Sequence, residues 1–416
     1  MIVSKFFKSA SLRRQLVSTI EQRFSVGKEQ AGDLYTWGTN TASLGYVVPQ
    51  TSLAEKAPRR VPEFDGNVVK VSMGPSHTAV ITTEGDLYTF GSSSKPVLGH
   101  GKPKGSQTTP KKVDFFAEKG IKIKDAICGE AQTIALAENG DVYSWGHGGR
   151  ESNLLMNIFF PSVGALGHGG VQNKELPTRI EYLKKFGPFK RITGGYHFVY
   201  AINEKGDIYN WGRGEYGVFG DGSNKSLKTP HFNDNFERMK VDDNLTVVKL
   251  SSANNYSVAL MSDGGLYGWG ANEFGQMGIK SDIGVEIYET APFPTPVIND
   301  DIKDLKIIDY KLGENIMIVL AEDNKVFWSG LRLAYKPEPL NLKTDKKVKA
   351  IGACYGAVAV VLEDNTVLMK NQFLPKKDED FETGVLTGDN SGFEGGDILQ
   401  IGGTYRNKYA IVKRKQ

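Results

Sequence analysis

Hydrophobic and polar residues alternate in a short pattern that recurs along this chain. Its five clearest copies begin at Gly32, Gly85, Gly140, Gly206 and Gly264 and read GDLYTWG, GDLYTFG, GDVYSWG, GDIYNWG and GGLYGWG. Gly, Asn and Asp at the start of a copy tolerate the positive φ of a tight turn, and the following residues alternate between two faces. In the fourth copy, Tyr209 and Trp211 share one face. Each copy therefore predicts the turn and second strand of a β-hairpin.

Two weaker copies of this motif follow, NKVFWSG at residues 324–330 and NTVLMKN at 365–371. Trp328 stands one residue earlier in its copy than the tryptophans of the other copies. Because side chains alternate along a strand, a shift of one residue moves a side chain to the opposite face. We therefore predict that Trp328 faces the other side of its sheet.

A second unit precedes every copy of the motif except the first. Its clearest examples cover residues 68–82, 123–137, 190–203 and 247–261, and weaker ones cover 306–321, 348–362 and 397–412. Each example contains two short apolar segments separated by small residues, which predicts two strands joined by a turn. The two units together predict a sheet of four antiparallel strands.

The two ends of the repeat array complement each other. The array starts with the second half of a repeat at residues 32–38 and ends with the first half of a repeat at 397–412. Joining these halves completes a seventh sheet and removes the exposed edges that an open array would leave. We therefore predict an all-β, seven-bladed β-propeller that is closed by pairing of its N- and C-terminal strands.

The first residues differ in composition from the repeats. Residues 1–20 contain Lys5, Lys8, Arg13 and Arg14, no acidic residue, and apolar residues at helical spacing. This composition is typical of a mitochondrial transit peptide. We predict a transit peptide over residues 1–24, a single propeller over 25–416, and location in the mitochondrial matrix or at the matrix face of the inner membrane. The alternative is a basic N-terminal arm that is retained.

Charge and apolar content narrow the choice of partners. The chain is 39% hydrophobic and 24% charged with a net charge of +3, and basic and acidic residues are interspersed. Nucleic-acid affinity requires clustered Lys and Arg, so we expect no direct sequence-specific contact with nucleic acid. No uncharged apolar run is long enough to span a bilayer. The sequence predicts a protein without a transmembrane segment, either free or peripheral to the inner membrane.

Motifs for catalysis are weak in this sequence. Residues 212–217 (GRGEYG) fit the dinucleotide pattern G-x-G-x-x-G, but they fall inside the repeat and no amphipathic helix follows. The two cysteines lie far apart in apolar segments, and the six histidines are spread over the repeats. His147 and His168 are close enough in sequence to approach each other, but two ligands rarely suffice for a metal. We expect no enzyme, no catalytic residues, no cofactor and no metal.

One insertion interrupts the third repeat. After Trp145-Gly146 the chain departs into residues 150–163, RESNLLMNIFFPSV, before the repeat pattern resumes. The apolar residues of this loop are our candidates for partner binding: Leu154, Leu155, Met156, Ile158, Phe159 and Phe160. Contiguous apolar surface on a loop usually marks an interaction site. The alternative is that the insertion folds back over its own blade.

The two repeating units resemble the regulator of chromosome condensation family, whose repeat combines V-x-x-G-x-x-H-T-x-A-L, G-x-V-Y-x-W-G and G-x-N-x-x-G-Q-L-G. The last part is best matched by GANEFGQMG at Gly270–Gly278, and the G-x-x-H part survives at Gly74–His77 and Gly194–His197. The resemblance covers residues 30–412 and implies a propeller. A histidine of this repeat is more often a hydrogen-bonding clamp between strands than a catalytic group.

The resemblance admits two functions. The family includes a nucleotide exchange factor for a Ran-type GTPase and many propellers that bind partners without chemistry, and its mitochondrial members resemble assembly or accessory factors. We expect a non-catalytic interaction protein that acts as an accessory or assembly subunit of a large mitochondrial complex, either the respiratory chain or the ribosome. The alternative is a guanine-nucleotide exchange factor for a mitochondrial small GTPase.

Overall fold

The computed structural model describes most of the chain between residues 31 and 414. The residues left out in this span are 40, 50, 93, 104, 150–164, 243, 280–288, 298–301, 303, 304 and 372–392. The predicted transit peptide (1–24) and the predicted insertion (150–163) therefore lie outside the described residues. The chain forms two compact units, which we call the four-sheet unit (28–215, 224–233 and 388–416) and the three-sheet unit (216–223 and 234–387).

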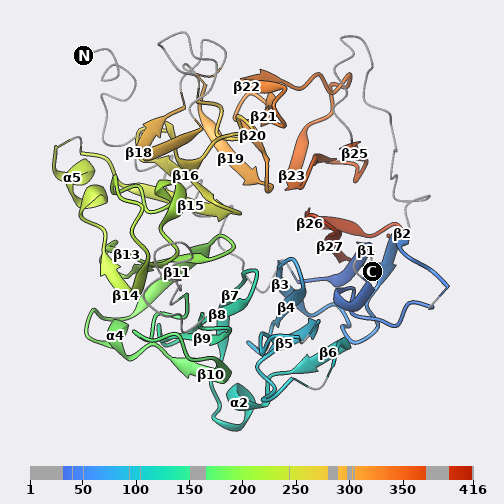
Figure 1. Ribbon diagram of the computed structural model, residues 1–416. Coiled ribbons are helices and arrows are strands. Elements are labelled where there is room, and N and C mark those ends of the chain that lie inside the picture. Colours follow the sequence, from blue (N-terminus) through green and yellow to red (C-terminus); the bar gives the residue numbers. More distant parts are fainter. Residues whose placement is uncertain are drawn as a thin grey trace. The chain divides into compact units, whose positions relative to one another are not determined.

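The four-sheet unit contains four antiparallel sheets of four strands (Figure 1). The strands are β1 (Asp33–Gly38), β2 (Glu55–Arg60), β3 (Val68–Met73), β4 (His77–Thr82), β5 (Leu87–Gly91), β6 (Gln107–Lys112), β7 (Ile123–Cys128), β8 (Gln132–Ala137), β9 (Val142–Gly146), β10 (Lys174–Arg179), β11 (Phe189–Gly194), β12 (Phe198–Asn203), β13 (Ile208–Gly212), β14 (Leu227–Phe232), β26 (Asp397–Gly403) and β27 (Asn407–Lys413). Its helices are η2 (Thr41–Ser43), α2 (Asp114–Glu118) and α4 (Glu181–Lys184), and η3 (Glu215–Gly217) follows β13.

The three-sheet unit repeats the same architecture. Its strands are β15 (Val247–Ala253), β16 (Tyr256–Met261), β17 (Leu266–Ala271), β18 (Thr290–Pro296), β19 (Ile307–Leu312), β20 (Ile316–Ala321), β21 (Val326–Gly330), β22 (Ala334–Pro339), β23 (Val348–Cys354), β24 (Ala357–Leu362) and β25 (Val367–Asn371), and its helix is α5 (Asp234–Asp242). Two of its sheets have four strands, and the described part of the third has β23, β24 and β25. The two predicted repeat units thus form three strands of each sheet, and in the four-stranded sheets the outer strand comes from the connection that follows them.

The terminal strands complete one sheet, as the sequence predicts. Its order is β2-β1-β27-β26, and Figure 1 shows the first and last strands side by side. β1 and β27 pair in antiparallel register from Asp33 opposite Val412 to Gly38 opposite Asn407. The N- and C-terminal halves of one repeat are therefore joined by backbone hydrogen bonds. This part of the prediction is confirmed.

Three of the motif tryptophans, Trp145, Trp211 and Trp269, donate a hydrogen bond to the loop of the preceding repeat. In the four-sheet unit, the Trp145 indole N–H donates to the backbone oxygen of Val97 at 2.7 Å, and Trp211 donates to Ala165 at 3.1 Å. Both tryptophans are fully buried. The loop below Trp145 needs Gly99, since a Cβ there would lie 2.9 Å from the indole nitrogen and φ is +77°. The recurring tryptophan is therefore a packing residue that also satisfies a buried carbonyl.

Trp328 points to the opposite face, as predicted from its shifted position. It stands opposite Ile318 in the β20–β21 pair, whereas Ser329 occupies the place that Trp269 takes in the β16–β17 pair. Trp328 packs into the cluster that contains Ile351 from the following sheet. The Ser329 hydroxyl donates to the backbone oxygen of Gln276 at 3.1 Å and so replaces the missing indole donor.

Candidate interaction surface

The predicted partner-binding insertion leaves the four-sheet unit between β9 and β10. The six candidate residues, Leu154, Leu155, Met156, Ile158, Phe159 and Phe160, all lie outside the described residues. The structure does describe the two ends of the insertion, at residues 147–149 and from Ala165 onward. We call residues 147–149 and 171–173 the stem of the insertion.

The stem is fixed by hydrogen bonds on both sides. The His147 N–H donates to the backbone oxygen of Ala131 at 2.8 Å, in the turn between β7 and β8. The side-chain oxygen of Asn173 accepts from the Gly148 N–H at 3.1 Å and lies 2.8 Å from His147 Nδ1. Gly148 leaves no room for a side chain, because a Cβ there would lie 2.3 Å from the backbone oxygen of Gln172. The insertion therefore starts from a defined position beside the β7–β8 turn.

The same turn contacts the next sheet through a polar cluster. Glu130 lies 2.7 Å from His197 Nε2, and its N–H donates to the backbone oxygen of Tyr196 at 3.0 Å. Gln132 also donates to Tyr196 at 3.0 Å. Burial lowers the pKa of His197, and the opposing effect of the Glu130 carboxylate is smaller. A carboxylate can only accept a hydrogen bond, so His197 Nε2–H donates to Glu130.

This polar cluster was not predicted from the sequence. Glu130, Gln132 and His197 come from the turns of two neighbouring sheets, and they meet only because the repeats stack. The sequence did contain one usable signal: both turns connect the first two strands of their sheets, and the two sheets are consecutive. The cluster lies beside the stem of the insertion, because the His147 N–H donates to the same β7–β8 turn.

Among the other histidines, His77 joins two neighbouring sheets, whereas His100, His168 and His147 bond within their own repeats. His77 is fully buried with Nε2 2.7 Å from Thr133 Oγ1 of the next sheet, and burial lowers its pKa to about 3. His100 and His168 occupy equivalent positions, where their Nε2 atoms lie 2.9 Å from Thr89 and Ser144. The expectation that a repeat histidine is a clamp between strands is confirmed for His77. His168 bonds to Ser144 and His147 to Asn173, so the structure gives them separate partners.

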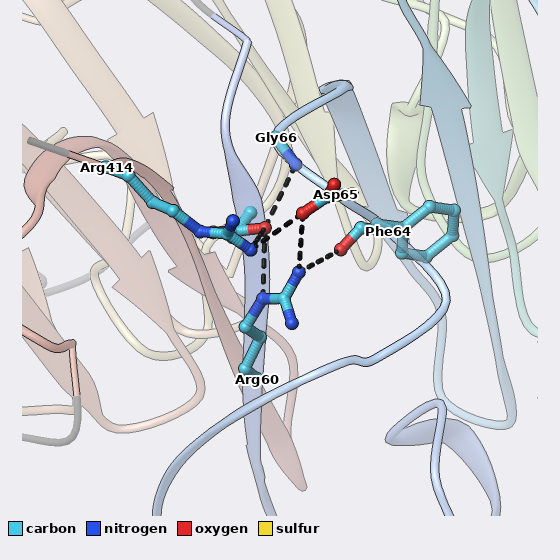
Figure 2. A network of polar contacts seen from close by, with 6 residues as sticks. Arg60, Phe64, Asp65, Gly66 and Arg414 are labelled. Atoms are coloured by element: carbon cyan, nitrogen blue, oxygen red, sulfur yellow. Dashed lines mark hydrogen bonds and ion pairs between the residues drawn. The ribbon is translucent and has the colours of Figure 1, made fainter. Parts of the chain in front are cut away.

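A second polar site joins the two terminal strands of the four-sheet unit. Asp33 is fully buried at the start of β1. Its carboxylate forms ion pairs with Arg60 Nε at 3.0 Å and Arg414 Nε at 2.5 Å, and it accepts a hydrogen bond from the Gly66 N–H at 3.0 Å. Figure 2 shows both guanidinium groups reaching Asp65. Asp65 lies 3.1 Å from Arg60 and 2.8 Å from Arg414, so it bridges them. We call Asp33, Arg60, Asp65 and Arg414 the terminal clasp.

The terminal clasp is a variant of a repeated contact. The aspartate at the same place in the next two motif copies also binds a basic residue at the end of the outer strand: Asp86 lies 2.6 Å from Lys112, and Asp141 lies 3.4 Å from Arg179. The first copy adds Arg414 from the C-terminal strand. The motif aspartate therefore ties the third strand of a sheet to its outer strand.

A cavity of about 360 Å³ lies beside the terminal clasp. Its lining includes Tyr35, Phe393, Glu394 and Arg414, and the Phe393 ring lies edge-on to Tyr35 at 5.4 Å. Asp33 and Arg414 are already paired with each other, so their charges stabilise the strand pairing. We assign the clasp and this cavity a structural role.

We also looked for metal-binding groups and membrane-spanning helices in the described ranges. Among the residues that the structure places, no group of three or more His, Cys, Asp or Glu side chains is arranged to hold a metal ion. In the same part of the chain, no helix is both long and apolar enough to cross a membrane.

The sheets and the repeat motifs define the class of this protein. Residues 22–336 match the model of the RCC1-like domain, which is more than half of the chain. The chain belongs to the RCC1-like domain family. Its seven sheets and the solved structures it resembles establish an all-β fold, the seven-bladed β-propeller.

Individual relatives share about a third or less of the aligned residues with this chain. The chain is 32% identical over 249 residues to the human E3 ubiquitin-protein ligase HERC2. The aligned region covers 58% of this chain and 5% of HERC2. It is 26% identical over 306 residues to the mitochondrial RCC1 domain-containing protein RUG3 of Arabidopsis thaliana, covering 71% of this chain and 62% of RUG3. The chain thus spans less than two thirds of the length of either relative.

Solved structures support the fold over almost the whole chain. The structure of Prp20p from Saccharomyces cerevisiae, described with its binding to Gsp1p and histones, superposes with a TM-score of 0.73. The match covers 93% of this chain and 92% of Prp20p at 19% sequence identity. At this identity the likeness establishes the fold alone.

Proposed function

We propose that this protein is a non-catalytic β-propeller interaction protein that acts as an accessory or assembly subunit of a large mitochondrial complex, either the respiratory chain or the ribosome. The proposal is supported by the apolar composition of residues 150–163 and by the hydrogen bonds that hold the stem on which they begin. Apolar loops on rigid scaffolds are common binding elements. Residues 1–24 would direct the chain to mitochondria, and the mitochondrial name of the relative RUG3 supports this location.

The stem explains how the insertion could bind with a defined orientation. His147 and Gly148 are held by Ala131 and Asn173, so less conformational freedom is lost on binding. The apolar residues of the insertion would form the centre of the interface. The polar groups of Glu130 and His197 would form part of its border, where water still reaches the contact.

The insertion can be tested by replacing its apolar residues. In a tagged full-length chain, the triple variant Ile158→Ser, Phe159→Ser, Phe160→Ser should lower co-purification of mitochondrial partners at least about tenfold, since each buried aromatic or aliphatic anchor contributes about 2 kcal/mol or more. The thermal midpoint should stay unchanged. Co-purification at the wild-type level would contradict the proposed role of the insertion.

The structure offers a matched control for this variant. Val47 and Leu53 lie in the loop between β1 and β2 with 66% and 89% of their surface exposed. The double variant Val47→Ser, Leu53→Ser also removes exposed apolar side chains from a loop of the same unit. It should leave co-purification unchanged. An equal loss in both variants would mean that general surface hydrophobicity, and not the insertion, retains the partners.

A second candidate function is guanine-nucleotide exchange on a mitochondrial small GTPase. It is favoured by the likeness to Prp20p, whose structure is described with binding to Gsp1p. The test is release of a labelled guanine nucleotide from GTPases that co-purify with the tagged chain. Our first proposal predicts no acceleration by the full-length protein. Acceleration of about tenfold or more would make exchange activity the leading function.

A further inference from the structure

Two short helices occupy equivalent positions in consecutive repeats of the four-sheet unit. α2 connects β6 to β7, and α4 connects β10 to β11. Each helix buries one apolar residue, Phe116 in α2 and Leu183 in α4, in the core cluster between the preceding and the following sheet. The preceding residue of each helix, Phe115 and Tyr182, is aromatic and only partly covered. The same surface feature is therefore built twice.

A lysine covers the outward aromatic ring at both places. Lys119 Nζ lies 5.1 Å from the centre of the Phe115 ring. Lys185 Nζ lies 4.0 Å from the centre of the Tyr182 ring and 5.0 Å from that of Phe186. Tyr182 keeps 39% of its surface exposed. Each helix thus presents an aromatic face with an ammonium group beside it.

Both helices lie at the Tyr143–Arg179 end of the β9–β10 pair, and the ring contacts that link α2 to this end run through the buried Tyr143. The Phe115 and Phe116 rings lie 6.1 and 5.2 Å from the ring of Tyr143 in β9. Tyr143 stands opposite Arg179 in the β9–β10 pair, and Arg179 Nε lies 2.7 Å from the carboxylate of Glu181, the first residue of α4. We call residues 111–122 and 179–190 the basic-aromatic surface.

This surface concentrates positive charge. Its two segments contain eight basic and three acidic residues, while the whole chain has a net charge of only +3. Lys112 and Lys122 both pair with the single carboxylate of Asp86. Lys119, Lys184 and Lys185 are exposed and lie within 4 Å of no carboxylate in the described part of the chain. These three lysines therefore lie beside the exposed Tyr182 ring and the partly buried Phe115 ring.

We propose that the basic-aromatic surface docks on an anionic lipid bilayer. Lysines near such a surface are attracted by its negative potential, and partly exposed Tyr and Phe rings favour the boundary between headgroups and acyl chains. This combination fits lipid better than an acidic protein, for which the aromatic rings would need a shaped apolar pocket. The proposal concerns a surface separate from the insertion and does not rest on the function proposed above.

The basic-aromatic surface lies away from the stem of the insertion. The stem of the insertion follows Gly146, which pairs with Lys174, whereas the basic-aromatic surface lies beside the pair of Tyr143 and Arg179. The stem and the surface therefore lie at opposite ends of the β9–β10 pair. A chain docked through α2 and α4 keeps this stem away from the bilayer, accessible to a partner.

The test measures binding of the full-length chain to sedimented vesicles. The vesicles contain phosphatidylcholine alone or with about a third phosphatidylglycerol. We expect binding to the anionic vesicles that weakens with salt, and a loss of about fivefold per neutralised lysine, hence on the order of a hundredfold for Lys119→Gln, Lys184→Gln, Lys185→Gln. Tyr182→Ser should weaken the binding that remains at high salt.

Two control variants keep the result interpretable. The triple variant Lys56→Gln, Lys102→Gln, Lys413→Gln removes three exposed lysines elsewhere in the same unit and should bind within about twofold of the wild type. Because residues 1–20 are themselves basic and apolar, all proteins should also be compared with Lys5, Lys8, Arg13 and Arg14 changed to Gln. The proposal would be overturned if the protein with these four N-terminal changes failed to bind anionic vesicles. It would also be overturned if the two triple lysine variants lost vesicle binding equally. Binding of soluble polyglutamate without binding of vesicles would overturn it as well.

Discussion

The terminal clasp makes a sharp prediction about how the ends of the chain are held together. In the variant Asp33→Ala, the Gly66 N–H and Arg414 lose a fully buried hydrogen-bond acceptor, and Arg60 loses an ion pair. Removing one partner of a buried ion pair typically costs about 3–5 kcal/mol. Here the side chains of Arg60 and Arg414 are 28% and 52% exposed and can regain water. We therefore expect a cost of about 2–3 kcal/mol.

The equivalent aspartate of the next sheet is a matched control. Asp86 binds Lys112 and Lys122, whose side chains are 38% and 44% exposed, and the Asp86 carboxylate is itself 17% exposed. Burial acts against the charge of Asp86, but the hydrogen bonds from the two lysines prevail and lower its pKa. Exposed pairs contribute little, so Asp86→Ala should cost about 1 kcal/mol or less.

Hydrogen exchange measures this difference where it acts. The clasp joins β1 to β27, so opening of this strand pair should need less free energy in Asp33→Ala. A cost of about 2–3 kcal/mol corresponds to about 30- to 150-fold faster exchange in peptides covering residues 407–413. Asp86→Ala should leave these peptides unchanged. Wild-type exchange of β27 amides in Asp33→Ala would refute the argument that the clasp secures the terminal strands.

Two further predictions concern the contacts between sheets. Trp145→Phe removes the indole donor to Val97 and should cost about 1 kcal/mol, whereas Trp145→Ala also empties a fully buried site and should cost about 3–5 kcal/mol; equal denaturation midpoints for the two variants would contradict this. Burial lowers the pKa of His77 to about 3 from an ordinary value near 6.5, so the stability that its neutral form contributes is fully present above pH 6.5 and is lost as the pH falls towards 3. At pH 5 the loss of folding free energy is about 2 kcal/mol. His77→Gln should therefore lose less stability than the wild type between pH 7 and pH 5. Thermal unfolding with the same pH dependence in both proteins would contradict this prediction.

The fold could be predicted because the signals that define it are local and repeated. The copies of the Trp motif mark the turn and third strand of most sheets, and the two incomplete ends match each other. Even the reversed side of Trp328 followed from counting residues along one strand. Alternation along a strand decides the face of a side chain without reference to the rest of the molecule.

The contacts that matter for the site were harder to predict because they depend on distant parts of the chain. Arg414 meets Asp33 across almost the whole sequence, and Glu130 meets His197 only through stacking of two sheets. α2 and α4 have only five and four residues, too few for a periodic apolar pattern to stand out. The insertion itself, from Leu154 to Phe160, stays a prediction from its apolar composition.

The most direct test of the proposed function is native size fractionation of mitochondria that carry the tagged full-length chain, with mass spectrometry of the proteins that co-migrate. We predict co-migration with subunits of the ribosome or of a respiratory complex, and loss of this co-migration in the variant with serine at positions 158–160. Migration as a small species together with a GTPase would contradict the account and favour nucleotide exchange.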